Sequence, residues 1–458
     1  MVPLRVRRTR GGGAKLLPVL LATLVLAACG GDDDADEGAE TGAGETAAGE
    51  TTTAPELDFD LVIGDIVSLT GAENVFGPSH QAAADLAKAE IDGALEEAGV
   101  DVTVELEHAD DETTPQGAVA AARRLVASDA SCVTGPLTSS SAIAVAEAVT
   151  VPEGVPNVAT SASSIEISEL EDEGLVFRLF PSDALQGPAV ARVIAEEIGS
   201  DATLSLAARN DAFGEGFMSV FKPAWEELGG TAIGPLLYDP EAASLDSEAQ
   251  RIVSRDVDGY FILDFPSSYA KLGAALLRAG NFSGDDLYVA GGQPAEIPSE
   301  VPFESMDGAV GTRPGVPQAE SWDAFVELYE GTDGLPPLEA FAQNNFDATV
   351  LCFLAALQAG SNDPEEIKET LLTVSGPPGD KFTWQELPEA VEALAAGEDI
   401  DYDGISGEID FDEVGDPTSA IYDVYKYIDG TQTVVGQYDV DTEELTITDP
   451  EAAGFGDD

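Results

Sequence analysis

Basic residues are scarce in this chain of 458 residues: lysine and arginine number 20, whereas aspartate and glutamate number 87. The formal net charge is −67 at pH 7. A nucleic-acid partner is therefore excluded, because phosphate binding needs clustered lysine and arginine. A strongly acidic surface keeps a protein soluble in concentrated salt, as in halophilic organisms, and we favour this explanation over cation binding. The acidic residues are scattered, and the stretch Asp401-Tyr402-Asp403-Gly404 is too short for a calcium loop.

Histidine and cysteine are also rare. The two histidines, His80 and His108, lie in no recognisable catalytic context, and the chain has neither a Gly-x-Ser-x-Gly elbow nor a His-rich motif. We therefore expect no enzyme activity, no metal and no cofactor. Apart from Cys29, the cysteines are Cys132 and Cys352, each inside an apolar run. They form either two buried thiols or one long-range disulfide, and an exported protein favours the disulfide.

The amino-terminus has the layout of a secretory leader. Five basic residues precede an apolar run from Leu16 to Ala28, which is too short to span a bilayer stably. The run ends in Leu26-Ala27-Ala28-Cys29, a pattern that resembles the lipobox of bacterial lipoproteins. That resemblance implies cleavage after residue 28, a lipid on Cys29 and attachment to the outer face of the cell membrane. The alternative is an ordinary signal peptide with an incidental cysteine.

The segment from Gly30 to Thr53 contains almost only Gly, Asp, Glu, Ala and Thr. With nothing large to bury, residues 29–57 are predicted to be a flexible acidic tether. About 400 residues follow, which is more than one hydrophobic core normally serves, so two lobes are expected. No second long apolar segment occurs, and the body is predicted to be globular.

Strands and helices alternate along the body, as in an α/β protein with doubly wound parallel sheets. The first copy of this pattern has expected strands at 61–67, 102–106, 130–134, 157–159 and 175–180, with helices at 81–98, 116–128 and 139–149. A second copy begins at Ala189, with expected strands at 203–208, 259–264 and 286–290. Its helices are expected at 189–198, 216–228, 246–255 and 269–279. Three later helices, at 321–329, 344–359 and 364–373, return to one lobe or the other.

Serine and threonine gather in the loops that follow three predicted strands of the first copy, at residues 67–71, 135–141 and 160–164. Ligands of parallel sheets bind at this edge. Hydroxyls and free backbone N–H groups there suit a carboxylate or amide oxygen. Any one such loop is also an ordinary helix cap, but three on one sheet indicate a binding site.

The body contains, in this order, the motifs Ser68-Leu69-Thr70-Gly71, Asp110-Asp111, Gly135-Pro136, Val176-Phe177-Arg178, Pro181-Ser182-Asp183, Phe213-Gly214-Glu215-Gly216 and Asp403-Gly404-Ile405-Ser406-Gly407. Their order resembles the branched-chain amino acid (Leu/Ile/Val) family of type I periplasmic binding proteins, and the resemblance covers nearly the whole body. It implies two lobes joined by a three-strand hinge that closes on a small solute, and monomeric action with the permease subunits of an ABC importer. The implied division is 58–180 and 318–375 for lobe 1, 181–317 and 376–445 for lobe 2, and 446–458 for a tail.

The resemblance also implies the binding residues. Ser139 and the loop Ser161-Ala162-Ser163 would hold the α-carboxylate and help hold the ammonium, while Phe76 and Phe213 would contact the ligand side chain. Phe265 or Tyr269 lies near a further aromatic position.

One position departs from the family pattern. Where amino-acid binders have an acidic residue for the ligand's ammonium, this chain has Gly291-Gly292-Gln293. A neutral amide supplies no counter-charge. An amino acid is the leading candidate, Asp264 could replace the missing acid, and the alternatives are an amide, a urea-like compound or a small aromatic acid. A ligand-sensing receptor module is a further alternative, although such a module usually has a signalling segment after the body, and here Asp458 is the last residue.

Overall fold

The computed structural model describes residues 57–315 and 319–449. The predicted leader, the predicted lipid site Cys29 and nearly all of the predicted tether lie outside these residues. In the described part of the chain, no helix is long and apolar enough to cross a membrane.

The first sheet is parallel and has five strands in the order β2-β1-β3-β4-β5. Strand β1, which lies between β2 and β3, is buried continuously over its second half, which fits a mostly apolar sequence in which Asp65 is a buried polar exception. The strands are β1 (Asp58–Val67), β2 (Asp101–Asp110), β3 (Cys132–Thr134), β4 (Asn157–Ala159) and β5 (Val176–Arg178). The helical segments between them are α1 (Gly77–Ala98), α2 (Pro115–Ala127), α3 (Ser139–Val145), a π-helical turn at Ala146–Thr150, α4 (Val151–Glu153) and α5 (Ile165–Ser168). The predicted β-α-β alternation is confirmed here.

The second sheet has eight strands in the order β16-β15-β14-β10-β9-β8-β6-β7. Strands β6 to β10 are parallel, whereas β14, β15 and β16 add an antiparallel meander at one edge. Sequence periodicity did not identify this meander, β7 or β10. The strands are β6 (Thr203–Arg209), β7 (Thr231–Tyr238), β8 (Gly259–Leu263), β9 (Leu287–Ala290), β10 (Val310–Pro314), β14 (Ile421–Ile428), β15 (Thr431–Asp439) and β16 (Glu444–Ile447). The helices are α6 (Asp183–Ile198), α7 (Ala212–Leu228), α8 (Asp246–Val253) and α9 (Pro266–Ala279), with short 3-10 turns at Gly284–Asp286 and Phe303–Ser305.

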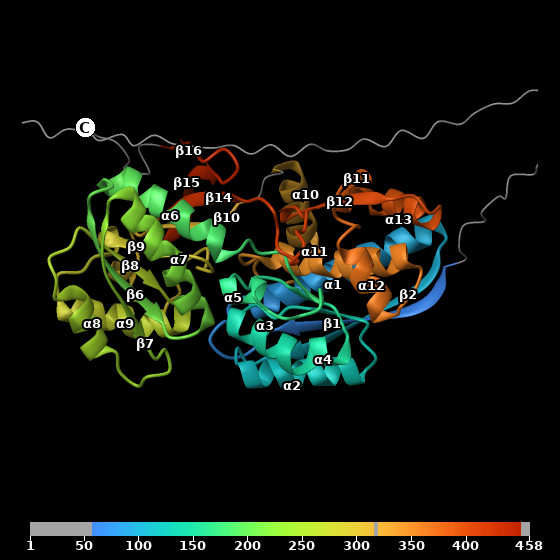
Figure 1. Ribbon diagram of the computed structural model, residues 1–458, viewed down its shortest axis with the longest axis horizontal. Coiled ribbons are helices and arrows are strands. Elements are labelled where there is room, and N and C mark those ends of the chain that lie inside the picture. The colour runs from blue at the N-terminus through green and yellow to red at the C-terminus, as the bar shows by residue number, and fades with distance from the viewer. Residues whose placement is uncertain (1–56, 316–318, 450–458) are drawn as a thin grey trace, which may run out of the picture. The chain divides into compact units, whose positions relative to one another are not determined.

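The segment between β10 and β14 packs against the first sheet. Helix α11 (Ala342–Ala359) is almost completely buried and lies against α1, as does α13 (Leu387–Ala395) (Figure 1). The other elements of the segment are α10 (Ala319–Gly331), α12 (Pro364–Leu371), a 3-10 turn at Trp384–Glu386, and the small sheet of β11 (Asp380–Thr383), β12 (Ile400–Gly404) and β13 (Gly407–Glu408).

Two predicted boundaries need correction. Residues 376–409 were expected in lobe 2, but Leu387, Val391, Ile400 and Tyr402 are buried in the same core as α1 and α11. Helix α13 (Leu387–Ala395) packs against α1 and α11, so this stretch belongs to lobe 1. The tail was expected from residue 446, yet β16 continues to Ile447 and pairs with β15.

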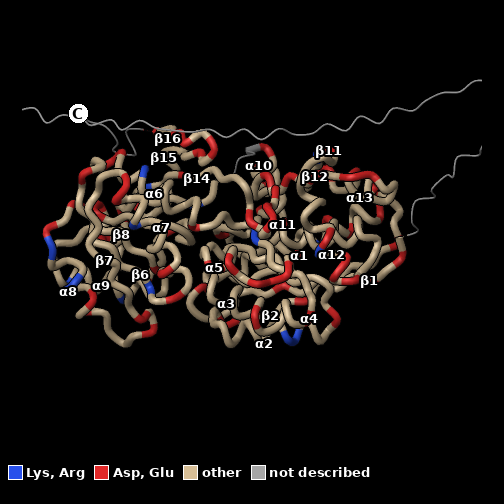
Figure 2. The backbone as a smooth tube through the Cα atoms, in the orientation of Figure 1, with Lys and Arg blue, Asp and Glu red and all other residues tan. Residues whose placement is uncertain are grey.

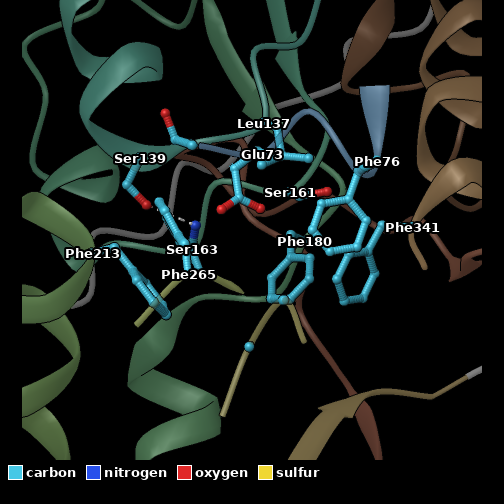
Figure 3. A pocket seen from close by; sticks show the side chains of 13 residues that line it. Glu73, Phe76, Leu137, Ser139, Ser161, Ser163, Phe180, Phe213, Phe265 and Phe341 are labelled. Carbon is cyan, nitrogen blue, oxygen red and sulfur yellow. Dashed lines mark hydrogen bonds between the residues drawn. The ribbon is translucent and has the colours of Figure 1, made fainter. Parts of the chain in front are cut away.

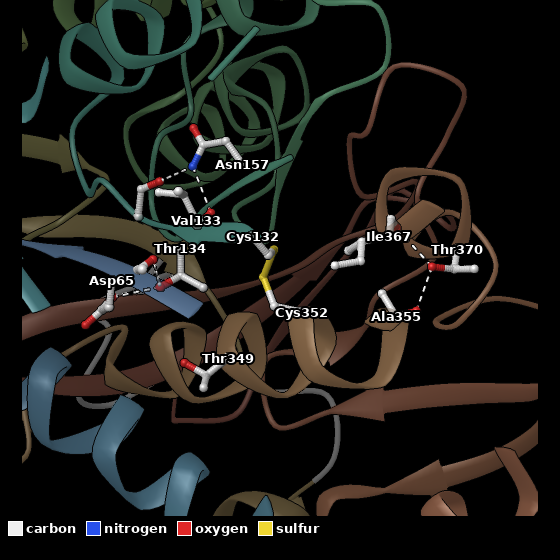
Figure 4. Close-up of a disulfide and its surroundings, with 12 residues drawn as sticks. Asp65, Cys132, Val133, Thr134, Asn157, Thr349, Cys352, Ala355, Ile367 and Thr370 are labelled. Carbon is white, nitrogen blue, oxygen red and sulfur yellow. Dashed lines mark hydrogen bonds between the residues drawn. A yellow bond between two sulfur atoms is a disulfide. The ribbon is translucent and has the colours of Figure 1, made fainter. Parts of the chain in front are cut away.

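A disulfide joins Cys132 of β3 to Cys352 of α11 (Figure 4). Both cysteines have no exposed surface. The expected long-range disulfide is therefore confirmed, and it fastens helix α11 to β3, the middle strand of the first sheet.

The chain passes between the two lobes three times: after β5, after β10 and after β13. A buried ion pair ties two of these passages together. The Arg178 guanidinium donates to Asp416 Oδ1 at 2.6 Å and to the Ser164 carbonyl at 2.8 Å. Arg178 has no exposed surface, so this pair fixes the passage after β5 against the passage before β14.

Acidic residues are distributed over both lobes, whereas basic residues are few (Figure 2). In the described residues, no group of three or more His, Cys, Asp or Glu side chains is placed to hold a metal ion. The scattered distribution agrees with an acidic solvated surface.

Candidate ligand-binding site

A small cavity lies where the loops after β1, β3 and β4 of lobe 1 approach the loops after β6, β8 and β9 of lobe 2. Its volume is about 30 Å³, room for roughly two water molecules. The two lobes touch beside it, because the Ser164 hydroxyl donates to the Ala212 carbonyl at 3.0 Å. The residues that line the cavity are Glu73, Phe76, Leu137, Thr138, Ser139, Ser161, Ser163, Phe180, Phe213, Phe265, Gly291, Gly292 and Phe341.

Three serines from two loops form the polar wall. The Ser139 oxygen accepts the backbone N–H of Ser163 at 3.2 Å and that of Ser164 at 3.1 Å, so it holds the loop after β4 against the start of α3 (Figure 3). The buried Ser161 oxygen has no hydrogen-bond partner among the described residues. The hydroxyl hydrogens of Ser139 and Ser161 are therefore available to an acceptor on a ligand.

Five phenylalanines form the apolar wall. Phe213 and Phe265 of lobe 2 stack with their centroids 5.6 Å apart. Phe180 and Phe341 meet edge to face at 5.1 Å, and Phe76 stands beside them in Figure 3. Each ring is at most 9% exposed. Because rings from both lobes share this wall, an apolar group in the cavity would contact both lobes at once.

Glu73 brings a carboxylate into this apolar surrounding. The residue is 1% exposed, and its Oε1 atom has no hydrogen-bond partner. Burial raises the pKa of Glu73 well above its ordinary value; nearby Arg209 opposes this rise, and Asp264, Asp111 and Asp211 add to it. Figure 3 shows the carboxylate between the serines and the phenylalanine rings.

Phe341 separates the cavity from a second hollow. The same residue lines a neighbouring groove of about 390 Å³, whose other walls include Arg313, Trp322 and Leu338. Its backbone lies in the left-handed region at φ 68°, which costs a bulky residue free energy and occurs mostly where structure enforces it. The preceding carbonyl, of Ala340, contacts the His80 ring at 2.8 Å. The local structure thus holds Phe341 in place between the cavity and the neighbouring groove.

Five of the predicted binding residues line the cavity: Phe76, Ser139, Ser161, Ser163 and Phe213. Two do not, and they are corrections. Ala162 has no exposed surface and packs with Ala142 and Ala159 in a small core. The Gln293 side chain turns away and donates to the Asp264 carbonyl at 2.9 Å, because Gly291 and Gly292 take its place at the cavity.

Two residues were candidates for the further aromatic position, and the structure places only one of them at the cavity. Phe265 lines the cavity, whereas Tyr269 is buried elsewhere and donates to the Ser305 carbonyl at 2.6 Å. Asp264 does not replace the missing acid, because it is absent from the cavity wall and accepts from the Phe265 N–H at 2.9 Å.

Sequence reasoning missed Glu73, Leu137, Thr138, Phe180 and Phe341. Leu137 and Thr138 lie within a loop that had been singled out as a whole. Glu73 lies three residues before Phe76 in the loop after β1, so that loop alone could have indicated it. No local pattern marks Phe341, which reaches the cavity only because α11 packs in lobe 1.

Two α/β lobes that meet at the carboxyl ends of their strands, around one shared cavity, define a hinged solute-binding protein. The chain belongs to the periplasmic binding protein family, whose model matches residues 60–426. The family's members are extracytoplasmic solute-binding proteins and not enzymes.

Known relatives agree with this assignment. The Leu/Ile/Val-binding protein BraC3 of Rhizobium johnstonii is 26% identical over 382 residues, which cover 82% of this chain and 93% of that protein. A crystal structure of a leucine-binding protein from Thermotoga maritima has a TM-score of 0.65 at 21% identity and covers 85% of this chain and 99% of its own. An ABC transporter solute-binding protein of R. palustris in complex with benzoate has a TM-score of 0.62 at 16% identity, covering 86% and 99%. These structures show the same fold.

Proposed function

We propose that the protein captures a small carboxylic acid with an apolar body, an apolar amino acid first of all, and delivers it to the permease subunits of an ABC importer. The observation that supports this proposal is that the cavity has a polar wall of serines and an apolar wall of phenylalanines. Serine hydroxyls from two loops face five phenylalanine rings across one small space.

Each wall suits one part of such a solute. Hydroxyl and backbone donors bind a carboxylate through charge-assisted hydrogen bonds, which are stronger than neutral ones. The rings bury an apolar side chain, which contributes roughly 1.5–3 kcal/mol. A solute that touches both lobes stabilises the closed arrangement over the open one by its differential contacts. The cavity of about 30 Å³ is smaller than such a side chain, so the rings must move as the solute enters.

A small aromatic acid without an amino group is the second candidate. It is favoured by the five phenylalanines that line the cavity and by the lack of an acidic residue at positions 291–293, where the acid was expected. The benzoate complex of the R. palustris protein gives this candidate a precedent in the same fold.

The proposal includes a tether. Lipid attached to Cys29 would hold the protein at the outer face of the membrane, and residues 29–57 would let the monomeric body reach the permease. Mass spectrometry of the mature protein tests this point, since it should find a diacyl- or triacyl-modified Cys29 as the first residue.

Thermal unfolding of the purified protein tests the solute class. Leucine, isoleucine, valine, phenylalanine and benzoate are added separately, each in large excess. A ligand at 100 times its dissociation constant stabilises the folded state by about 2.7 kcal/mol, which raises the melting temperature measurably. If none of these compounds shifts the melting temperature, the proposed solute class is wrong.

A further inference from the structure

Glu73 is the one ionisable residue among those that line the cavity in the described structure. No lysine or arginine lines it, so an anionic solute would meet a carboxylate there and no opposing cation. A solute without positive charge would therefore bind only with Glu73 protonated. The role of this side chain decides which charge the solute carries.

The backbone around Glu73 is fixed. Its N–H donates to Thr113 Oγ1 at 3.2 Å, and its carbonyl accepts the Phe76 N–H at 3.0 Å. The carboxylate consequently stays beside the rings with Oε1 unpartnered. A buried polar atom without a partner costs free energy unless something satisfies it, and such an atom aimed into a ligand cavity indicates what the ligand provides.

We propose that Glu73 pairs with a positively charged nitrogen of the solute, so that the cavity selects an amino acid over the same acid without its amino group. The inference rests on the proposed function, because it assumes a solute in this cavity. Glu73, in the loop after β1 of lobe 1, would then supply the negative charge that was expected from an acidic residue near position 293.

Arg209 is the cationic side chain near Glu73, and it already forms ion pairs with two other carboxylates. Its Nε atom pairs with Asp211, its guanidinium lies 3.5 Å from the centroid of the Phe265 ring, and its Nη1 atom lies 3.7 Å from Asp264 Oδ1. No ion pair joins Arg209 to Glu73. Two carboxylates already neutralise this guanidinium, so the Glu73 carboxylate is left for the solute.

Binding of a positively charged solute should change the protonation of Glu73. In the empty cavity, burial raises the pKa of the Glu73 carboxyl. An arriving ammonium lowers that pKa again, so the carboxyl loses its proton to solvent and an ammonium–carboxylate pair forms. Amino-acid affinity should accordingly rise with pH through the Glu73 pKa of the empty protein.

Calorimetric titration with leucine and with isocaproate, its analogue lacking the amino group, tests the inference. We expect wild-type protein to prefer leucine and to release protons when leucine binds in buffers of different ionisation enthalpy. In Glu73→Gln, leucine affinity should fall roughly 30- to 1,000-fold, since one partner of a buried charge pair is lost, while isocaproate affinity stays equal or rises. Glu97→Gln makes the same charge change on the exposed face of α1 and should bind both compounds like wild type.

The contrary results are distinct. If Glu73→Gln weakens both compounds equally, Glu73 stabilises the protein or pairs with Arg209, and the inference is overturned. If wild-type protein binds isocaproate but not leucine, the proposed capture of a small carboxylic acid is kept, and the proposed pairing of Glu73 with an ammonium is overturned. If wild-type protein binds neither, nor the other compounds of the thermal screen, the proposed function fails with it. Melting curves of each variant show whether it is folded.

Discussion

Removing the disulfide with Cys132→Ala/Cys352→Ala should destabilise lobe 1 strongly without changing the binding cavity. The two cysteines are 220 residues apart, and the loop they close contains the whole parallel part of the second sheet. A cross-link over so long a loop lowers the entropy of the unfolded chain, which corresponds to about 5 kcal/mol of stability. Residual structure in the unfolded chain reduces such values, so we expect a loss of roughly 3–5 kcal/mol.

Urea unfolding followed by circular dichroism measures this loss. The unfolding midpoint of the double variant should fall well below that of wild type at similar slope. Leucine affinity at low urea should be unchanged, because neither cysteine lines the cavity. Equal midpoints for the two proteins would refute the reasoning, since the cross-link would then constrain nothing that unfolds.

Three other perturbations have defined outcomes. Phe341→Ala should open the cavity into the neighbouring groove of about 390 Å³. The affinity for phenylalanine should then rise roughly tenfold relative to that for valine. Unchanged selectivity would mean that the Phe341 ring does not limit the size of the solute. Ser139→Ala leaves two buried amides without their acceptor and should cost about 2 kcal/mol of stability as well as leucine affinity, while Ser139→Thr, which keeps the hydroxyl, should recover most of both. Burial alone would lower the pKa of His108, but its hydrogen bonds to Asp65 and Asp85 and their charges raise it to about 9. Protonated His108 therefore stabilises the folded protein. This stabilisation is complete below the ordinary histidine pKa near 6.5 and is lost as pH rises through about 9. His108→Gln should therefore flatten the pH dependence of the unfolding midpoint in that range.

Much of the fold could be predicted from the sequence because its first sheet is built from short apolar strands alternating with amphipathic helices. The same patterns failed for the meander β14 to β16, whose residues alternate weakly between buried and exposed. The division implied by the family resemblance placed the residues of α13 in the wrong lobe, because the apolar face of a helix does not identify the elements it packs against. Only the long-range packing against α1 and α11 decides this.

The binding site was predictable where it lies in loops directly after strands, as Ser139, Ser161 and Phe76 do. Gln293 failed because a turn at Gly291, with φ 77°, directs its side chain back to Asp264. Phe341 failed because it lies in no loop that follows a strand, and it reaches the cavity through tertiary packing. Glu73 was overlooked because, in so acidic a chain, only its position in the loop after β1, three residues before Phe76, distinguishes it from the other acidic residues.

Capture between the lobes is tested by the leucine affinity of Phe76→Ala and Phe213→Ala, which truncate one ring of each lobe. Each ring contributes buried apolar area worth roughly 1.5–3 kcal/mol, so each variant should bind leucine about 10- to 150-fold more weakly than wild type. Loss in both variants is the expected result. Loss in only one, or in neither, would contradict a solute held between the two lobes.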